Sequence, residues 1–335
     1  MFVMFVKYYV LKVLIVVWYI DFHSLNTKMK KFWVGTLLAV VAVFTIINVE
    51  NNSKNDNTNA ELKIVSTVGM IDDIVLQLAG DLVDNHLLMP AGTDPHVYVP
   101  VVSDVSMLDS ADVIFALGLD LEAQMTDALN SLSKSRPVYF VGNTVDNDKL
   151  IAQGENYFDP HIWFDLDLYS QMVEVVGASL VELLSEHESL INDRLANYLL
   201  ELEQLDLYAR ESFSAIPESN KWIVTTHDAF SYFARSFDFN IKTLKGVSTN
   251  SDYSLKDKQD LQDVILSNSI PAIFVEDSVS SRDLDAVMSN IRDQGLDIKM
   301  GGTLFADSLG SPGSEFETFV SCFKSNVDII TKALK

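Results

Sequence analysis

The stretch Leu190–Ile216, LINDRLANYLLELEQLDLYARESFSAI, decides the fold. Its apolar residues recur at spacings of three and four, which is the pattern of an amphipathic helix with one apolar stripe. The stripe consists of Leu195, Tyr198, Leu199, Leu202, Leu205 and Tyr208. Pro217 follows and cannot continue a helix. At about 1.5 Å per residue the helix would be about 40 Å long, enough to run along two lobes as a rigid connection.

Short β-rich runs lie on both sides of this helix and alternate with helical patterns, which is typical of βαβ units with parallel sheets. One series precedes it: Lys63–Thr67, Leu87–Met89, Val113–Ala116 and Val138–Val141. The other series follows it: Trp222–Thr225, Ile241–Leu244, Ile273–Val275 and Ile298–Met300. Leu166–Leu184, before the long helix, has a helical pattern of its own.

These patterns predict an α/β fold of two lobes, each a mostly parallel four-stranded sheet with flanking helices. The predicted N-terminal lobe is 61–189, the linking helix 190–216 and the C-terminal lobe 217–335. A binding cleft is expected between the lobes.

Residues 1–60 are predicted to be a leader and tether. Met-Lys-Lys at 29–31 and the apolar run Phe32–Ile47 have the layout of a signal sequence, with no clear cleavage site after it. A second apolar run, Met1–Ile20, is either a first membrane segment or an extension upstream of a true start at Met29, and we favour the extension. Asn51–Ala60 is a polar tether.

Composition excludes several classes of protein. The chain has 335 residues and a net charge of −23, whereas nucleic-acid binding needs clustered Lys and Arg. This charge suits a protein that concentrates small cations. Cys322 is the single cysteine, so neither an intramolecular disulfide nor a thiolate zinc cluster can form. We expect Cys322 to be a buried residue of the last helix.

Three histidines and one aspartate are candidate metal ligands. His96 and His227 each follow a predicted strand, Asp307 lies just past the last one, and His161 lies on a loop. Open α/β sheets place binding residues at the carboxyl ends of their strands, and two candidates come from each lobe. Three imidazoles and one carboxylate suit zinc and also tolerate manganese or ferrous iron.

The candidate loops share a local motif, because His96 and His161 both stand in the sequence Asp-Pro-His. Proline restricts its own φ and the residue before it, so the motif fixes the approach of the loop. Asp94 and Asp159 are also candidate acceptors for a ring N–H. Spacing alone does not separate these histidines from ordinary loop or core residues. The remaining histidines, His23, His86 and His187, are interpreted as ordinary residues.

Six stretches together resemble the zinc/manganese solute-binding proteins of ABC importers, the periplasmic metal-binding proteins of cluster A-I. They are 92–98 (GTDPHVY), 159–165 (DPHIWFD), 226–233 (THDAFSYF), 246–251 (GVSTNS), 271–278 (PAIFVEDS) and 302–310 (GTLFADSLG). The resemblance implies two lobes joined by a long helix with limited hinge motion. It also implies a monomer that carries one Zn²⁺ or Mn²⁺ as transported ligand and has a membrane permease as partner. The implied ligands are His96, His161, His227 and Asp307.

Three departures from the family pattern bear on the metal and the location. His227 stands where manganese-leaning members often have Glu, which favours zinc. Val97–Pro160 contains no histidine, whereas zinc-specialised members often carry a His-rich loop there, so members that take zinc or manganese match best. No lipid-attachment cysteine is present, which favours a periplasmic location.

Two rival functions belong to other classes. A zinc hydrolase needs an open coordination position, and the chain has no His-Glu-x-x-His helix, although Glu276 lies in a suitable region for a general base. No phosphate-binding G-x-x-x-x-G-K loop appears either, so the chain is not the importer's ATPase. A surface adhesin remains an alternative. For a metal-capturing protein, affinity should fall below about pH 6.5 as the imidazoles protonate.

Overall fold

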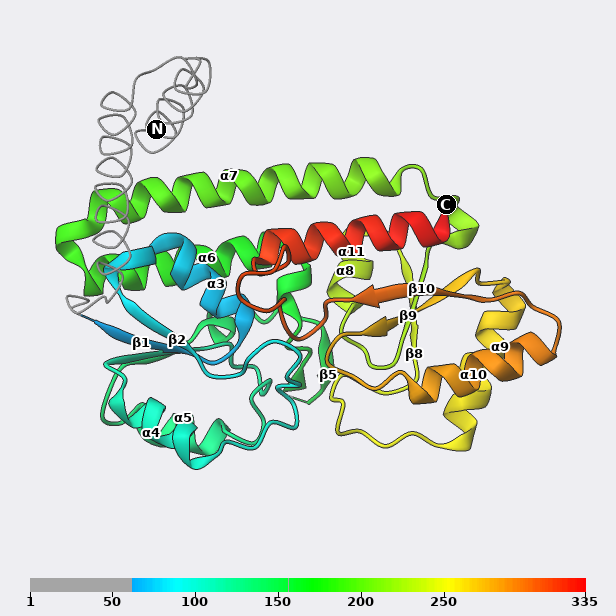
Figure 1. Cartoon of the computed structure of the whole chain (residues 1–335), viewed down its shortest axis with the longest axis horizontal. Coiled ribbons are helices and arrows are strands. Elements are labelled where there is room, and N and C mark those ends of the chain that lie inside the picture. The colour runs from blue at the N-terminus through cyan, green and yellow to red at the C-terminus, as the bar shows by residue number, and fades with distance from the viewer. Residues whose placement is uncertain (1–61, 156) are drawn as a thin grey trace, which may run out of the picture. The chain divides into compact units, whose positions relative to one another are not determined.

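The computed structural model describes residues 62–155 and 157–335 (Figure 1). The predicted leader and tether, residues 1–60, lie outside the described residues. Within the described part of the chain, no helix combines the length and the apolar composition needed to cross a membrane.

The N-terminal lobe is built on a parallel sheet with the strand order β2-β1-β3-β4. Its strands are β1 (Lys63–Ser66), β2 (Asp84–Leu87), β3 (Val113–Ala116) and β4 (Val138–Phe140). The helices between them are α3 (Gly69–Leu78), α4 (Val102–Ser110) and α5 (Thr126–Leu132). β3 is buried at every position, because a central parallel strand is covered on both faces. The four-stranded parallel sheet predicted here is confirmed.

Two details of this lobe differ from the prediction. The second strand is Asp84–Leu87 and not Leu87–Met89, because pairing with β1 extends into a polar stretch: Lys63 pairs with Asp84 and Ser66 with Leu87. β2 is an edge strand, where polar side chains reach solvent. The antiparallel pair β5 (Ala152–Gly154) and β6 (Tyr157–Phe158) was not predicted, since its residues are exposed or half-buried and carry no apolar alternation.

The C-terminal lobe contains two parallel strand pairs, β7 with β8 and β9 with β10. Their bounds are β7 (Trp222–Thr225), β8 (Asn240–Thr243), β9 (Ala272–Glu276) and β10 (Lys299–Leu304). β7 packs next to β9, but the two pairs are not hydrogen-bonded to each other, so the lobe has two parallel pairs where one four-stranded sheet was predicted. The helices are α8 (Ser231–Phe237), α9 (Leu255–Asn268), α10 (Arg282–Asp293) and α11 (Phe319–Leu334). α9 and α10 cover a small core of this lobe that includes Ile265, Ile273 and Leu284.

The long helix α7 spans Glu188–Phe213, close to the predicted Leu190–Ile216, and follows α6 (Leu166–Leu183). It packs against α3, α6 and α11 and runs past both lobes in Figure 1. Its buried stripe is Ile191, Tyr198, Leu202, Leu205, Ala209 and Phe213. The long connecting helix is therefore confirmed.

A shared apolar core lies beneath α7 and α11 and belongs to both lobes. Phe164, just before α6, packs on Phe230 of the other lobe with ring centroids 4.5 Å apart. Phe233 of α8 lies 5.8 Å from Phe323 of α11. Tilted and edge-to-face aromatic pairs of this kind add to the stability gained by burial. The lobes are thus joined by packed side chains as well as by one helix, which opposes large hinge motion.

Candidate metal centre

The two Asp-Pro-His motifs fold in the same way. Asp94 Oδ1 accepts a hydrogen bond from His96 N at 3.0 Å, and Asp159 Oδ1 accepts one from His161 N at 3.0 Å. Each aspartate therefore forms a tight turn with the backbone two residues on, with proline fixing the middle position. The repeated sequence produces two histidines that leave the backbone from equivalent turns.

The two ligand candidates of the C-terminal lobe follow the ends of strands. Glu276, the last residue of β9, accepts hydrogen bonds from Thr226 N at 2.8 Å and His227 N at 3.1 Å. The backbone before Asp307 is held at Ala306, whose carbonyl accepts from Trp163 Nε1 at 3.1 Å. Because Trp163 lies two residues after His161, this bond ties the loops of the two lobes together.

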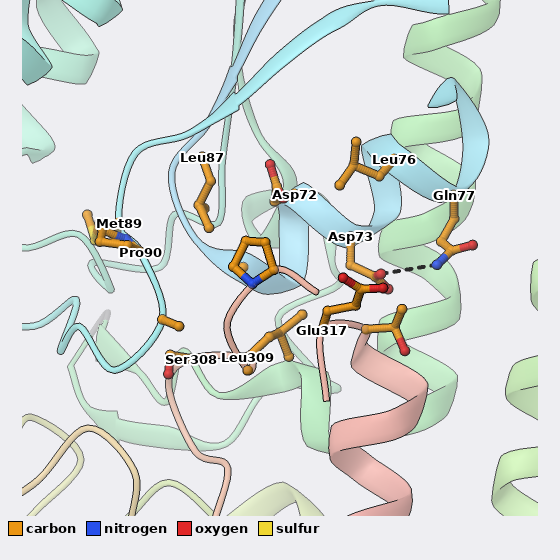
Figure 2. Close-up of a pocket in the computed structure, with 15 residues that line it drawn as sticks. Asp72, Asp73, Leu76, Gln77, Leu87, Met89, Pro90, Ser308, Leu309 and Glu317 are labelled. Carbon is orange, nitrogen blue, oxygen red and sulfur yellow. Dashed lines mark hydrogen bonds between the residues drawn. The ribbon is translucent and has the colours of Figure 1, made fainter. Parts of the chain in front are cut away.

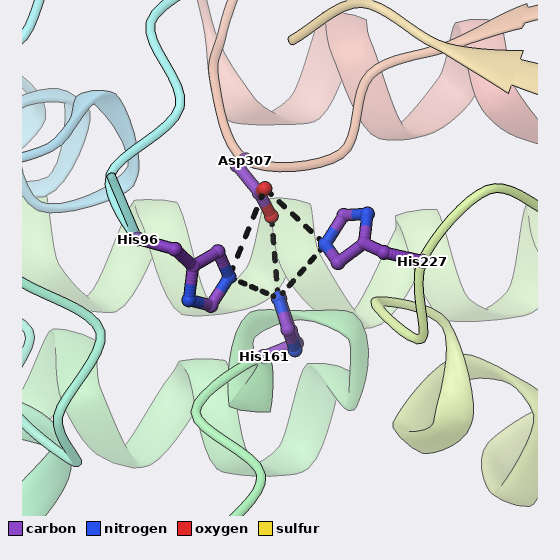
Figure 3. A group of neighbouring side chains, drawn as sticks. All are labelled: His96, His161, His227 and Asp307. Atoms are coloured by element: carbon purple, nitrogen blue, oxygen red, sulfur yellow. Dashed lines mark hydrogen bonds and ion pairs between the residues drawn. The ribbon is translucent and has the colours of Figure 1, made fainter. Parts of the chain in front are cut away.

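The four predicted residues converge between the lobes (Figure 3). The Nε2 atom of His161 lies 3.2 Å from His96 Nε2, 3.4 Å from His227 Nε2 and 3.3 Å from Asp307 Oδ1. Asp307 Oδ2 lies 3.3 Å from His227 Nε2 and 3.9 Å from His96 Nε2. All four residues are buried, with at most 2% of their surface exposed.

This geometry fits a tetrahedral ion. With metal–nitrogen distances of about 2.0–2.1 Å, neighbouring ligand atoms of a tetrahedron are about 3.3–3.4 Å apart. Most of the separations above fall close to that value. Both carboxylate oxygens of Asp307 are buried without a hydrogen-bond partner, which is costly unless a cation compensates. The donor atoms are therefore arranged to hold a cation and leave no open position for a substrate.

The carboxylates around the cluster favour the protonated form of two of its imidazoles. Burial favours the neutral imidazole, but Asp159 and Asp307 outweigh it and raise the pKa of His161 to about 9. Burial is likewise outweighed at His227, where Asp307 and Glu276 raise the pKa well above its usual value. At His96, burial dominates and lowers the pKa to about 3. Burial opposes ionisation of Asp307 too, yet His227 and His161 hold its pKa well below the usual value.

Two carboxylates orient the imidazole rings of His161 and His227 by bonding to their Nδ1 atoms, on the side away from the site. Asp159 Oδ1 lies 2.6 Å from His161 Nδ1, and Glu276 Oε1 lies 2.5 Å from His227 Nδ1. Each bond directs Nε2 of its histidine into the site. Asp159 thus contacts the ring as predicted, whereas Asp94 bonds the backbone N–H of His96. The orienting role of Glu276 was missed, because it lies 49 residues from His227 and no local spacing connects them.

Substitution of Glu276 by glutamine is expected to weaken zinc binding by about 10–100-fold, the usual cost of losing a group that orients a ligand. Glutamine has one acceptor oxygen, whereas Glu276 accepts from two backbone N–H groups and the His227 ring. Competition with a chromophoric zinc chelator measures the affinity. Glu203→Gln, an exposed position on α7, is the control for loss of one negative charge. An affinity within twofold of the unmodified protein would contradict this role for Glu276.

The other histidines of the described chain lie outside the cluster. His86 pairs with Asp84 on β2 at 3.1 Å, and His187 pairs with Glu186 at 3.6 Å. His23 lies outside the described residues. Cys322 is a buried free thiol in α11, as predicted, and donates to the Phe316 carbonyl at 3.0 Å.

Comparison with known proteins places this fold and site in a family. The family model described as zinc-uptake complex component A, periplasmic, matches residues 64–333. The manganese-binding lipoprotein MntA of Bacillus subtilis is 34% identical over 303 residues, which cover 90% of this chain and 99% of that protein. The zinc-binding protein TroA of Treponema pallidum is 36% identical over 282 residues, covering 84% of this chain and 92% of TroA.

Solved structures agree with the sequence comparison. The structure of the periplasmic zinc-binding protein TroA from Treponema pallidum superimposes with a TM-score of 0.80 at 37% identity, covering 82% of this chain and 99% of that one. The chain therefore belongs to the zinc-uptake component A family, the substrate-binding proteins of metal ABC importers, which are not enzymes.

Proposed function

We propose that this chain captures one divalent transition-metal ion with His96, His161, His227 and Asp307 and delivers it to the membrane permease of an ABC importer. The observation that carries the proposal is the buried cluster of four donor groups, in which the oxygens of Asp307 face the ring nitrogens of the three histidines and accept no other hydrogen bond. Such a cluster is stable only when a cation or protons occupy it. Because no coordination position stays open, the site suits capture and transport.

Zinc is the metal we favour, with manganese second. Three imidazoles and a single carboxylate oxygen form the donor set that zinc prefers in tetrahedral sites, whereas manganese favours more oxygen ligands. The relatives do not decide between the two, since MntA is named for manganese and TroA for zinc.

We further propose a setting for the protein. MntA is named a manganese-binding lipoprotein, and SsaB of Streptococcus sanguinis is named a metal ABC transporter substrate-binding lipoprotein. We infer that residues 1–60 direct export, that the protein acts in the periplasm as a monomer, and that its lobes are 61–189 and 217–335. Export rests on the leader pattern of the sequence, and the bounds of the lobes rest on the positions of the strands. The periplasmic location and the monomer rest on the resemblance to the family.

Elemental analysis of protein purified without chelator or a metal-affinity column tests the proposal. We expect about one equivalent of zinc per chain. Competition with excess manganese then separates the two metals: retained zinc identifies a zinc importer subunit, and ready exchange identifies a system that takes both. Absence of stoichiometric metal, even after incubation with excess zinc and manganese, would contradict the function.

Metal binding is expected to release protons at neutral pH, because the raised pKa values of His161 and His227 keep these rings protonated until the ion arrives. Zinc affinity should therefore keep increasing with pH above the range near pH 6.5 predicted from free imidazole, because the pKa of His161 is about 9 and that of His227 is also raised. Calorimetric titration in buffers of different ionisation enthalpy measures the protons released. Identical binding enthalpies in all buffers would contradict the expectation.

A further inference from the structure

A cavity that does not include the four donor residues has a volume of about 530 Å³ and lies beside α3 (Figure 2). This is within the range of about 300–1,000 Å³ that is usual for small-molecule sites. Its apolar walls come from Leu76, Leu87, Met89 and Leu309. Three of its polar side chains are carboxylates, those of Asp72, Asp73 and Glu317, and the others are Gln77, Ser308 and Thr318.

The carboxylates have hydrogen-bond partners but no cationic partner. Asp73, only 4% exposed, accepts from Tyr198 Oη at 2.6 Å and from Gln77 Nε2 at 3.1 Å. Asp72 accepts from Asn85 Nδ2 at 2.8 Å. Among residues 62–155 and 157–335, no Lys or Arg forms an ion pair with Asp72, Asp73 or Glu317.

Because these carboxylates are buried without a cation, the pKa values of the two neighbouring aspartates are raised. Burial, and then the charge of Asp73, raise the pKa of Asp72 to about 6. Burial also raises the pKa of Asp73, despite the hydrogen bonds that it accepts. Two carboxylates that are held partly desolvated would gain from a cation that enters the cavity.

We propose that this cavity binds a small organic ammonium ion with an aliphatic stem, such as an alkylamine or a polyamine. The ammonium group would lie against Asp72 and Asp73 and form charge-assisted hydrogen bonds. The stem would cover the side chains of Leu76, Leu87 and Met89. Anionic ligands are excluded because every ionisable side chain that lines the cavity is acidic. A neutral ligand of the same shape would leave the carboxylates without a cation.

Residues that line the cavity belong to the segments that carry His96 and Asp307. Met89 and Pro90 belong to the segment that leads to His96, and Ser308 and Leu309 directly follow Asp307. The two segments are joined where Gly92 N donates to Ser308 Oγ at 2.8 Å. Gly92 has a φ of 76°, a conformation that disfavours other residues. A ligand that contacts both segments therefore holds together the loops that carry His96 and Asp307.

From this connection we expect ammonium binding and metal binding to favour each other. This coupling rests on the proposed function, whereas occupancy of the cavity does not. Coupling free energies between two sites usually change affinity by about 5–150-fold, and the change is the same in both directions. The affinity for the amine should thus rise about fivefold or more when the metal centre is loaded with zinc.

Methyl NMR of protein labelled with [¹³C-methyl]methionine tests occupancy without metal, with hexylamine as the probe and 1-hexanol as its neutral match. The Met89 methyl signal should shift saturably with hexylamine, with a dissociation constant of about 1 mM or tighter. The signal of Met172, buried in α6 and not part of the wall, should stay in place. Equal shifts with 1-hexanol, or no saturable shift with hexylamine or spermidine, would overturn the proposal.

Charge variants identify the carboxylates. Asp73→Asn and Asp72→Asn should each weaken hexylamine binding about tenfold or more, and Glu203→Gln should leave it unchanged. Asp72 is less buried than Asp73, so its variant keeps the test valid if Asp73→Asn fails to fold. Unchanged affinity in both variants overturns the site.

Repeating the hexylamine titration with zinc-loaded protein measures the coupling between the two sites. Equal hexylamine affinity with and without zinc overturns the coupling alone. Failure to bind zinc would show in elemental analysis and leave the NMR result intact.

Discussion

Substitution of His161 by alanine is expected to weaken zinc binding by about several hundredfold. His161 is the central donor of the cluster, because its Nε2 atom lies within 3.4 Å of a donor atom from each of the other three residues. Sites with four protein ligands bind zinc with about 10–16 kcal/mol near neutral pH, so one ligand contributes on the order of 3–4 kcal/mol. Each 1.4 kcal/mol corresponds to about tenfold in affinity.

Competition with a chromophoric zinc chelator measures this loss, and circular dichroism shows whether the protein remains folded. His86→Ala is the matched control, since His86 lies on β2 and pairs with Asp84 outside the cluster. Because Asp159 would lose its ring partner in His161→Ala, His161→Asn serves as a second variant that offers this carboxylate a polar side chain. A zinc affinity equal to that of the unmodified protein in both variants would remove His161 from the site.

Zinc is expected to raise the free energy of unfolding by about 4 kcal/mol when the free ion is held a thousandfold above its dissociation constant. An ion that binds the folded state alone stabilises it by mass action. The physical source is the cluster itself, in which the only groups facing the buried Asp307 oxygens in the described chain are the imidazoles that would share the ion. A bound ion would contact groups from both lobes, so that separating the lobes would require its release.

Urea unfolding at free zinc concentrations set by a chelator buffer measures this increment. The midpoint should rise with zinc in the unmodified protein and in His86→Ala, and should rise much less in His161→Ala. Manganese at the same multiple of its own dissociation constant should produce the same increment, because the linkage depends on saturation and not on the identity of the ion. A midpoint that does not depend on zinc would show that the cluster binds no ion in the folded state.

Much of the fold could be predicted because its signals are local. The stripe of α7 recurs every three or four residues, and strands such as β3 and β7 are short apolar runs with the predicted bounds. The four converging residues were candidates because three of them follow predicted strands and because the chain resembles a metal-binding family. The local Asp-Pro-His motif sets the turns at His96 and His161. For these features, backbone geometry and nearest neighbours are sufficient.

Other features depend on residues far apart in the chain. β2 begins at Asp84 because β1 pairs with it there, against the polar character of its own residues. Glu276 orients His227 from another strand, and its role follows from the packing of β9 beside β7. The aromatic contact of Phe164 with Phe230 joins two predicted lobes that the sequence pattern treats as separate.

The sequence by itself therefore determined the class of fold and the long helix, since each is encoded by a local periodicity, and it supplied the four candidate residues through strand positions and family resemblance. The tertiary structure alone decided how those residues meet: the separations between donor atoms, the carboxylates behind two of the rings, and the acidic cavity between the segments of His96 and Asp307. The physical reason is that burial, and with it the ionisation of buried groups, depends on which distant segments exclude water from a side chain.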